Sequence, residues 1–300
     1  MAATTQYNAT AKVPDITKLI TCISPDDTPL FSMMGTGGPA TQVLHSWEEE
    51  ELRGPEKNAQ VEGFTYEAKE IDPSDLKSNL TQIFFKGYGI SDTNKAVKYQ
   101  NIKDVLGHKM ANAMKEIGLD CEYAILNNTK KVTGSKTTPR EMGGVPYFIK
   151  TNILGNGGTK RGLTYGLLND AIEQVFNCGG NPNVIVASGR NKRVLSNLLP
   201  LNTDRTQSAS AKKVVHTIDI FEGDFGRQRV MTNRWMSNDE VYILSEEYLK
   251  KAYLRPFKKM DLPKKGSATE KAIEGEWTIE VRAEKAHAVI RDLNGELPSA

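Results

Sequence analysis

The feature that most constrains the fold of this chain is one long stripe of apolar residues with the period of an α-helix. Between residues 99 and 127 apolar side chains recur at steps of three and four, and most charged side chains lie off the stripe. Such a helix would span roughly 40 Å at ~1.5 Å per residue, and it contains two glycines, so it needs tertiary packing. The sequence therefore predicts one central helix, with a stripe formed by Ile102, Leu106, Met110, Ala113, Ile117, Cys121 and Ala124.

The segments before this helix are poor in residues that could form a core of their own. Residues 1–45 are rich in Thr, Pro, Gly and Ala but contain scattered apolar residues, which indicates an arm docked on another surface, with a short helix over 15–23. Few apolar residues lie between Arg53 and Leu80, so we interpret this acidic stretch as a projecting hairpin or long loop. Residues 79–91 are expected to form the strand that returns to the body.

The segment after the central helix has the pattern of a compact α/β unit. Thr164 is expected to cap a helix that ends near Gly179, and Pro200 is expected to stop a second helix over 191–199. Residues 266–274 look like a polar turn region. The overall class is therefore α+β, with strands expected at 184–187, 214–221, 227–232, 241–244, 277–282 and 286–291.

The net charge of +2 conceals two patches of opposite sign. Residues 1–90 carry 13 acids and 7 bases, whereas residues 91–300 carry 24 acids and 32 bases. Ten acids face three bases between Trp47 and Asp75, and seven bases face one acid between Lys250 and Lys265. The two patches are either separate solvated surfaces or complementary surfaces that meet between subunits. The small total does not support a protein dedicated to reading nucleic acid.

The chain lacks the common motifs of catalytic, metal and membrane proteins. Its three cysteines include no Cys-x-x-Cys pair, its four histidines are widely separated, and no phosphate loop, dinucleotide fingerprint or nucleophile elbow has the required spacing. No stretch is long and apolar enough for a membrane span, and residues 1–10 do not resemble a secretory signal. We therefore expect no enzyme, cofactor, metal or membrane, and we assign no catalytic, cofactor-binding or metal-binding residue.

The order of these parts, together with several short motifs, resembles the major capsid proteins of tailed bacteriophages with the Hong Kong 97-like fold. The resemblance covers roughly residues 11–293. Each motif is weak alone, and the order in which the motifs occur is more specific than any one of them. The matching segments are Asp27–Phe31, Ser46–Glu48, Val61–Gly63, Ser78–Ile83, Ile90–Ser91, Arg255–Phe257, Gly275–Val281 and Ala286–Leu293.

The resemblance implies a division of the chain into five parts. These are an N-terminal arm (1–45), an extended loop (46–91), a peripheral domain with a long spine helix (92–150), an axial domain (151–260), and a long strand that returns to the peripheral domain before the C-terminal end (261–300). Such proteins assemble into hexamers and pentamers that form an icosahedral shell around double-stranded DNA, without sequence-specific binding. The resemblance also implies a separate scaffolding protein, a portal, a decoration protein, and assembly in the host cytoplasm into the virion capsid.

In this arrangement the arm and the loop lie on neighbouring subunits, which would explain why they bury so little of themselves. We therefore predict that acids of the loop contact the basic segment of an adjacent subunit. Two alternatives remain open, namely a non-viral nanocompartment shell of the same fold and an enzyme with an unrecognised α/β site. The predicted inter-subunit contacts are Trp47, Glu48, Glu49, Glu50, Glu51, Arg255, Lys258, Lys259, Lys264 and Lys265.

Overall fold

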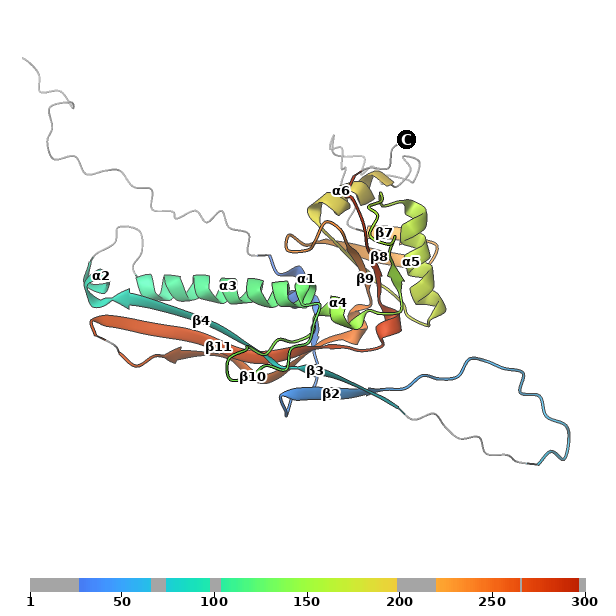
Figure 1. Ribbon diagram of the computed structural model, residues 1–300, viewed down its shortest axis with the longest axis horizontal. Coiled ribbons are helices and arrows are strands. Elements are labelled where there is room, and N and C mark those ends of the chain that lie inside the picture. The colour runs from blue at the N-terminus through green and yellow to red at the C-terminus, as the bar shows by residue number, and fades with distance from the viewer. Residues whose placement is uncertain (1–26, 66–73, 98–103, 199–219, 265, 297–300) are drawn as a thin grey trace, which may run out of the picture.

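The computed structural model describes residues 27–65, 74–97, 104–198, 220–264 and 266–296. A four-stranded sheet with a long helix on one face joins a six-stranded sheet covered by two further helices, and a two-stranded hairpin continues into a long loop (Figure 1). This is the α+β architecture that the sequence predicts. The short elements outside the three sheets are α1 (Pro29–Met33), α2 (Asp92–Ala96), α4 (Val145–Phe148), η2 (Glu246–Tyr248) and η3 (Glu284–Ala286).

The long helix, α3 (Val105–Asn127), is the predicted central helix. Its N-terminus is capped by Asp104, whose side chain accepts a hydrogen bond from the Gly107 amide at 3.0 Å, and it ends where the sequence predicts. The expected start near residue 99 and the first stripe residue, Ile102, lie within residues 98–103, which are outside the described part of the chain. The inner end of the predicted stripe is confirmed, because the buried apolar residues of the helix include Ala113, Ile117, Cys121 and Ala124.

The four-stranded sheet lies beneath α3, with strand order β1-β10-β11-β4 (Figure 1). Its two longest strands form an antiparallel hairpin, and β4 pairs antiparallel to β11 along most of its length. Trp277 from β11 is fully buried against Phe84 from β4, and their ring centroids lie 5.7 Å apart. The strands are β1 (Gly35–Thr36), β4 (Gln82–Ser91), β10 (Leu249–Asp261) and β11 (Ala268–Val281).

This sheet corrects two expectations. Residues 266–274 are not a polar turn, because β11 begins at Ala268 and pairs with strands on both sides. Backbone hydrogen bonds on two edges outweigh the local polarity of the segment. The expected boundary at residue 260 also does not coincide with the division between sheets, since Leu249–Asp261 already belongs to the four-stranded sheet.

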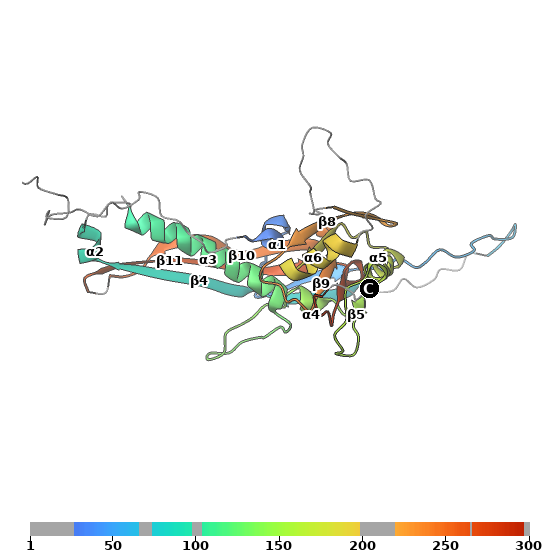
Figure 2. The same ribbon diagram turned by 90° about the horizontal axis from the view of Figure 1, so that it is seen from above.

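The six-stranded sheet has the order β5-β12-β9-β6-β8-β7 and is covered by α5 and α6 (Figures 1 and 2). The Thr164 hydroxyl caps α5 by accepting the Leu167 amide at 3.2 Å, which confirms the predicted cap. Residues 199–219, where another strand was expected to begin, lie outside the described residues, as does the expected helix over 15–23. The elements are β5 (Ile153–Leu154), α5 (Tyr165–Asn177), β6 (Val184–Ala187), α6 (Gly189–Leu198), β7 (Ile220–Gly223), β8 (Gly226–Thr232), β9 (Val241–Leu244) and β12 (Ala288–Ile290).

The two sheets share one apolar core. In β6, Ile185 and Ala187 pack toward α5 and α6, whereas Val184 and Val186 belong to the cluster that contains the end of α3 and Trp277. The alternation follows the two-residue period of a strand, so β6 is buried on both faces. The six-stranded sheet is therefore packed directly against the part of the molecule that carries the long helix.

Candidate functional site

The acidic loop connects the two strands of the hairpin, β2 (Leu44–Glu49) and β3 (Asp75–Leu80), and projects away from the body (Figures 1 and 2). Its described residues, 50–65, form no helix or strand. Apolar side chains on it are open to solvent, with Leu52 95% exposed and Val61 77% exposed. These side chains are therefore open to contact with a second molecule.

The alternation of β2 divides the acidic run into two sets. His45, Trp47 and Glu49 face the body, because successive side chains of a strand point to opposite faces. His45 Nε2 lies 2.6 Å from Glu280 Oε1, and Glu49 Oε1 accepts hydrogen bonds from Trp47 Nε1 at 2.8 Å and from the Ala283 amide at 3.0 Å. The inward set therefore attaches β2 to the end of β11.

The other acids of the run divide in the same way. Glu51 continues the inward set through an ion pair with Lys285 at 2.5 Å. Glu48 and Glu50 are exposed, and neither carboxylate has an ion pair or hydrogen bond with another described residue. Among the described residues of the run, the outward set is thus available to a second molecule without breaking a contact with another described residue.

At the other strand of the hairpin, Asn79 fixes the bend between β3 and β4. Its side chain is fully buried, and its Nδ2 donates to the carbonyl oxygens of Gly143 and Ile279, each at 2.9 Å. Its Oδ1 accepts the amides of Gly143 and Leu80, also at 2.9 Å. Because its donors and acceptors are all used, replacing this side chain would leave several buried backbone groups unpaired.

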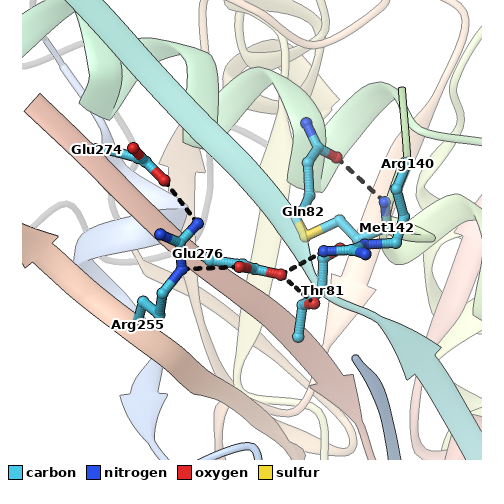
Figure 3. Close-up of polar contacts among 7 residues, drawn as sticks. All are labelled: Thr81, Gln82, Arg140, Met142, Arg255, Glu274 and Glu276. Carbon is cyan, nitrogen blue, oxygen red and sulfur yellow. Dashed lines mark hydrogen bonds and ion pairs between the residues drawn. The ribbon is translucent and has the colours of Figure 1, made fainter. Parts of the chain in front are cut away.

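Glu276 forms the second support of the bend (Figure 3). Its carboxylate is almost buried and accepts from Thr81 Oγ1 at 2.7 Å, from Arg140, and from Arg255 Nε at 3.0 Å. Arg140 Nε also donates to the Thr81 carbonyl oxygen at 2.5 Å, and Arg255 reaches Glu274 at 2.6 Å.

The charges around Glu276 determine how its carboxyl group titrates. Burial by itself raises the pKa of Glu276, but the hydrogen bonds from Thr81 and Arg255 and the charges of Arg140 and Arg255 outweigh it and lower the pKa. The carboxylate therefore stays ionised in the folded chain and holds the 129–141 segment, β10 and the bend together.

The predicted contact residues are not all free. Trp47 is only 9% exposed and packs on Phe148 with ring centroids 5.7 Å apart, so most of its side chain is already used within this chain, and its contact with a neighbour stays a prediction. Arg255 is engaged by Glu274 and Glu276, and Lys264 pairs with Asp92 at 2.6 Å.

Two predicted bases remain available. Lys258 and Lys259 are exposed and have no ion pair with another described residue, whereas Lys265 lies outside the described residues. The free acids lie in β2 and directly after it, whereas the free bases lie in β10, which belongs to a different sheet, and no ion pair among the described residues joins them.

The described residues contain no group of three or more His, Cys, Asp or Glu side chains that could hold a metal ion. None of the helices in this part of the chain has the length and apolar character that crossing a bilayer requires.

Comparison along the whole chain decides the family. The model of the SU10 major capsid protein family matches residues 2–294. The chain belongs to this family. A curated relative, the major capsid protein of Escherichia phage Phieco32, is 24% identical over 344 aligned positions, and the alignment covers 97% of each chain.

Solved structures show the same fold for this capsid protein. The capsid of cyanophage A-1(L) matches with a TM-score of 0.66 and 11% identity, covering 94% of this chain and 97% of the other. An encapsulin from Synechococcus elongatus matches with a TM-score of 0.61 and 10% identity, covering 98% and 95%. The resemblance to Hong Kong 97-like capsid proteins is confirmed, and the chain is a shell-forming structural protein of a virion.

The residues that support the bend in this capsid protein were not singled out as site residues from sequence. Asn79, Thr81 and Glu276 stand directly beside apolar strand residues, Leu80 and Trp277, in the sequence. Polar residues at such positions are a usable signal, because a buried polar side chain needs specific partners. The partners, however, come from segments distant in sequence, and only the fold reveals them.

Proposed function

We propose that the outward acids of the loop, Glu48 and Glu50, bind Lys258 and Lys259 of a neighbouring subunit within hexamers and pentamers of an icosahedral head that encloses double-stranded DNA. The observation that carries this proposal is that two oppositely charged sets, neither with an ion pair to another described residue, lie apart in one chain, the acids at the end of β2 and the bases in β10. A repeating head-to-tail contact satisfies both sets at once.

The contribution of each contact is small and its repetition matters. An exposed ion pair contributes about 0 to 1 kcal/mol and is weakened by salt. The exposed Leu52 and Val61 would add apolar burial in the same contact, at roughly 25 cal/mol per Å² of apolar area. The charges therefore set register and salt sensitivity, while the apolar residues supply most of the binding free energy.

The remaining expectations follow from this role. The protein acts as a shell component and not as an enzyme, and assembly takes place in the host cytoplasm with a separate scaffolding protein, a portal and a decoration protein. One structural neighbour, a satellite phage P4 procapsid with a TM-score of 0.57, includes a size determination protein, which supports control of the shell by a second protein.

Charge reversal tests the contact. Glu48→Lys combined with Glu50→Lys should prevent closed shells in electron micrographs at low salt and leave the unfolding midpoint of the unassembled chain unchanged. Adding Lys258→Glu and Lys259→Glu to the same chain restores complementary charge and should restore shells. Normal shells from the first variant, or no recovery in the second, would contradict the proposed contact.

A nanocompartment is the second candidate, supported by the likeness to an encapsulin. The two differ in content, because a phage head takes up DNA and a nanocompartment takes up protein. Nuclease-protected DNA in shells assembled in the presence of the packaging machinery supports the phage head, whereas a specifically enclosed protein would support the nanocompartment. The family match favours the head.

A further inference from the structure

Glu122, on the long helix α3, is a buried acid that takes no part in the contacts of the acidic loop. Its side chain is fully buried on α3, beneath the first described helix, α1. Glu122 Oε1 accepts the Leu30 amide at 2.9 Å, and Oε2 accepts the Phe31 amide at 2.6 Å. These two amides belong to the first turn of α1, where the backbone of a helix has no acceptors of its own.

The carboxylate also reaches the six-stranded sheet. Asn233, which follows β8, donates from Nδ2 to Glu122 Oε1. The amide group of Asn233 is oriented by its own Oδ1, which accepts the Trp235 amide at 2.9 Å, and its backbone amide donates to Ala187 at 2.9 Å. One side chain thus connects α1, α3 and the sheet on the other side of the shared core.

Alternative caps for α1 are absent from the described contacts. Thr28, at the N-cap position, makes no cap hydrogen bond, and its hydroxyl lies 3.2 Å from Ser32 Oγ. Pro29 has no amide to cap. A helix of five residues is not stable alone, so its placement depends on tertiary contacts.

The partners of the carboxylate are all uncharged N–H groups. Desolvation raises the pKa of Glu122, and the hydrogen bonds from Phe31, Leu30 and Asn233 lower it only in part. A buried carboxylate without a cation costs stability that an apolar residue would not. We therefore interpret the role of the Glu122 carboxylate as fixing the position of α1, since it does not increase the stability of the fold.

From this geometry we propose that Glu122 is a positioning residue for shell assembly, which fixes the place and direction at which the N-terminal segment joins the body. The inference rests on the proposed function, because direction matters only if this segment meets a neighbouring subunit. It concerns residues 27–33 and α3, and it does not depend on the contact between the acidic loop and β10.

The primary test is Glu122→Gln in the full-length chain, compared with Glu116→Gln. Whichever way the glutamine amide turns, its NH2 group faces at least one of the three donors. Glu116 is a matched control because it lies on the same helix, is exposed, and pairs with Lys86 at 2.5 Å away from α1. Hydrogen exchange of the Leu30 and Phe31 amides should accelerate at least tenfold in Glu122→Gln only, with no change in β9.

The same two proteins are then assembled and imaged by electron microscopy. Closed shells should fall at least fivefold for Glu122→Gln and stay at the wild-type yield for Glu116→Gln. Unchanged exchange at Leu30 and Phe31, or accelerated exchange with a wild-type yield of shells, overturns the proposal. Absence of shells from the wild-type chain would instead count against the proposed function.

A rescue variant separates positioning from general destabilisation. A Cβ placed on Gly118 would lie 3.5 Å from Thr28 Cγ2, so the side chains of cysteines at these two positions would face each other. Thr28→Cys with Gly118→Cys, added to Glu122→Gln and oxidised, reattaches α1 without restoring the carboxylate. Shells should return under oxidising conditions and be lost again on reduction. Failure to return with the disulfide formed overturns the proposal, also where Glu122→Gln alone folds poorly.

Discussion

The bend between β3 and β4 and the outer part of the acidic loop use their side chains in opposite ways. At the bend, Asn79 and Glu276 use their hydrogen-bonding groups within the chain and hold β3 and β4 in place. In the outer part, Leu52 and Glu50 are exposed and contact little of their own chain. The difference predicts that substitutions at the bend lower the stability of the chain, whereas substitutions in the outer part of the loop leave it folded and weaken assembly.

The largest effect on stability is expected at Glu276. Glu276→Gln leaves two arginines facing an amide in an almost buried site, and we expect a loss of about 3 kcal/mol in the free energy of unfolding. Urea denaturation of the unassembled chain measures it. A loss below about 1 kcal/mol would show that Glu276 does not hold the bend.

Acid should act on the same group. Because the pKa of Glu276 is lowered in the folded chain, its contribution is fully present above the unfolded value of 4.5 and is lost as the pH falls through the folded pKa. The difference in unfolding free energy between wild type and Glu276→Gln should therefore shrink below pH 4.5. A difference that stays constant from pH 7 to pH 3 would argue against this titration.

Two neighbouring glutamates, Glu49 and Glu50, should differ in the same way, with smaller effects on stability. Glu49→Ala leaves Trp47 Nε1 and the Ala283 amide without their acceptor and should cost about 1 kcal/mol of stability. Glu50→Ala, one residue further, should change stability by less than about 0.5 kcal/mol. Thermal unfolding of the two variants compares them directly, and equal losses would mean that the strand does not divide the run as described.

The smallest effect on stability should come from Leu52. Leu52→Ser removes an apolar side chain that is 95% exposed, so the unassembled chain should unfold at the wild-type midpoint. Light scattering should nevertheless show that a higher protein concentration is required for shells. Asn58→Ser on the same loop is the polar control, and identical assembly of both variants would remove Leu52 from the contact.

Local signals predicted a good part of this fold. The end of α3, the Thr164 cap and the strand at 241–244 are set by periodicity, capping and short apolar runs, which act over a few residues. The start of β11 could not be predicted in this way, because residues 268–274 become a strand only through pairing with β4 and β10.

The candidate site was predicted in part for a similar reason. Charge counting found the acidic run, but only the packing of Trp47 on Phe148 determines which glutamates turn inward. The bend residues were missed because their partners lie far away in the sequence, as with Thr81 and Glu276. The physical lesson is that composition identifies a surface, while strand period and long-range partners determine which of its residues are free.

The core shared by the two sheets has a further consequence for how a shell can bend. Because β6 is buried on both faces and joins the cluster around Trp277, the two sheets cannot turn against each other without opening that core. The two sheets and the helices packed on them are therefore expected to keep one rigid arrangement at every position in the shell. Differences in local curvature between five-fold and six-fold environments would then be absorbed outside it, for example by the acidic loop.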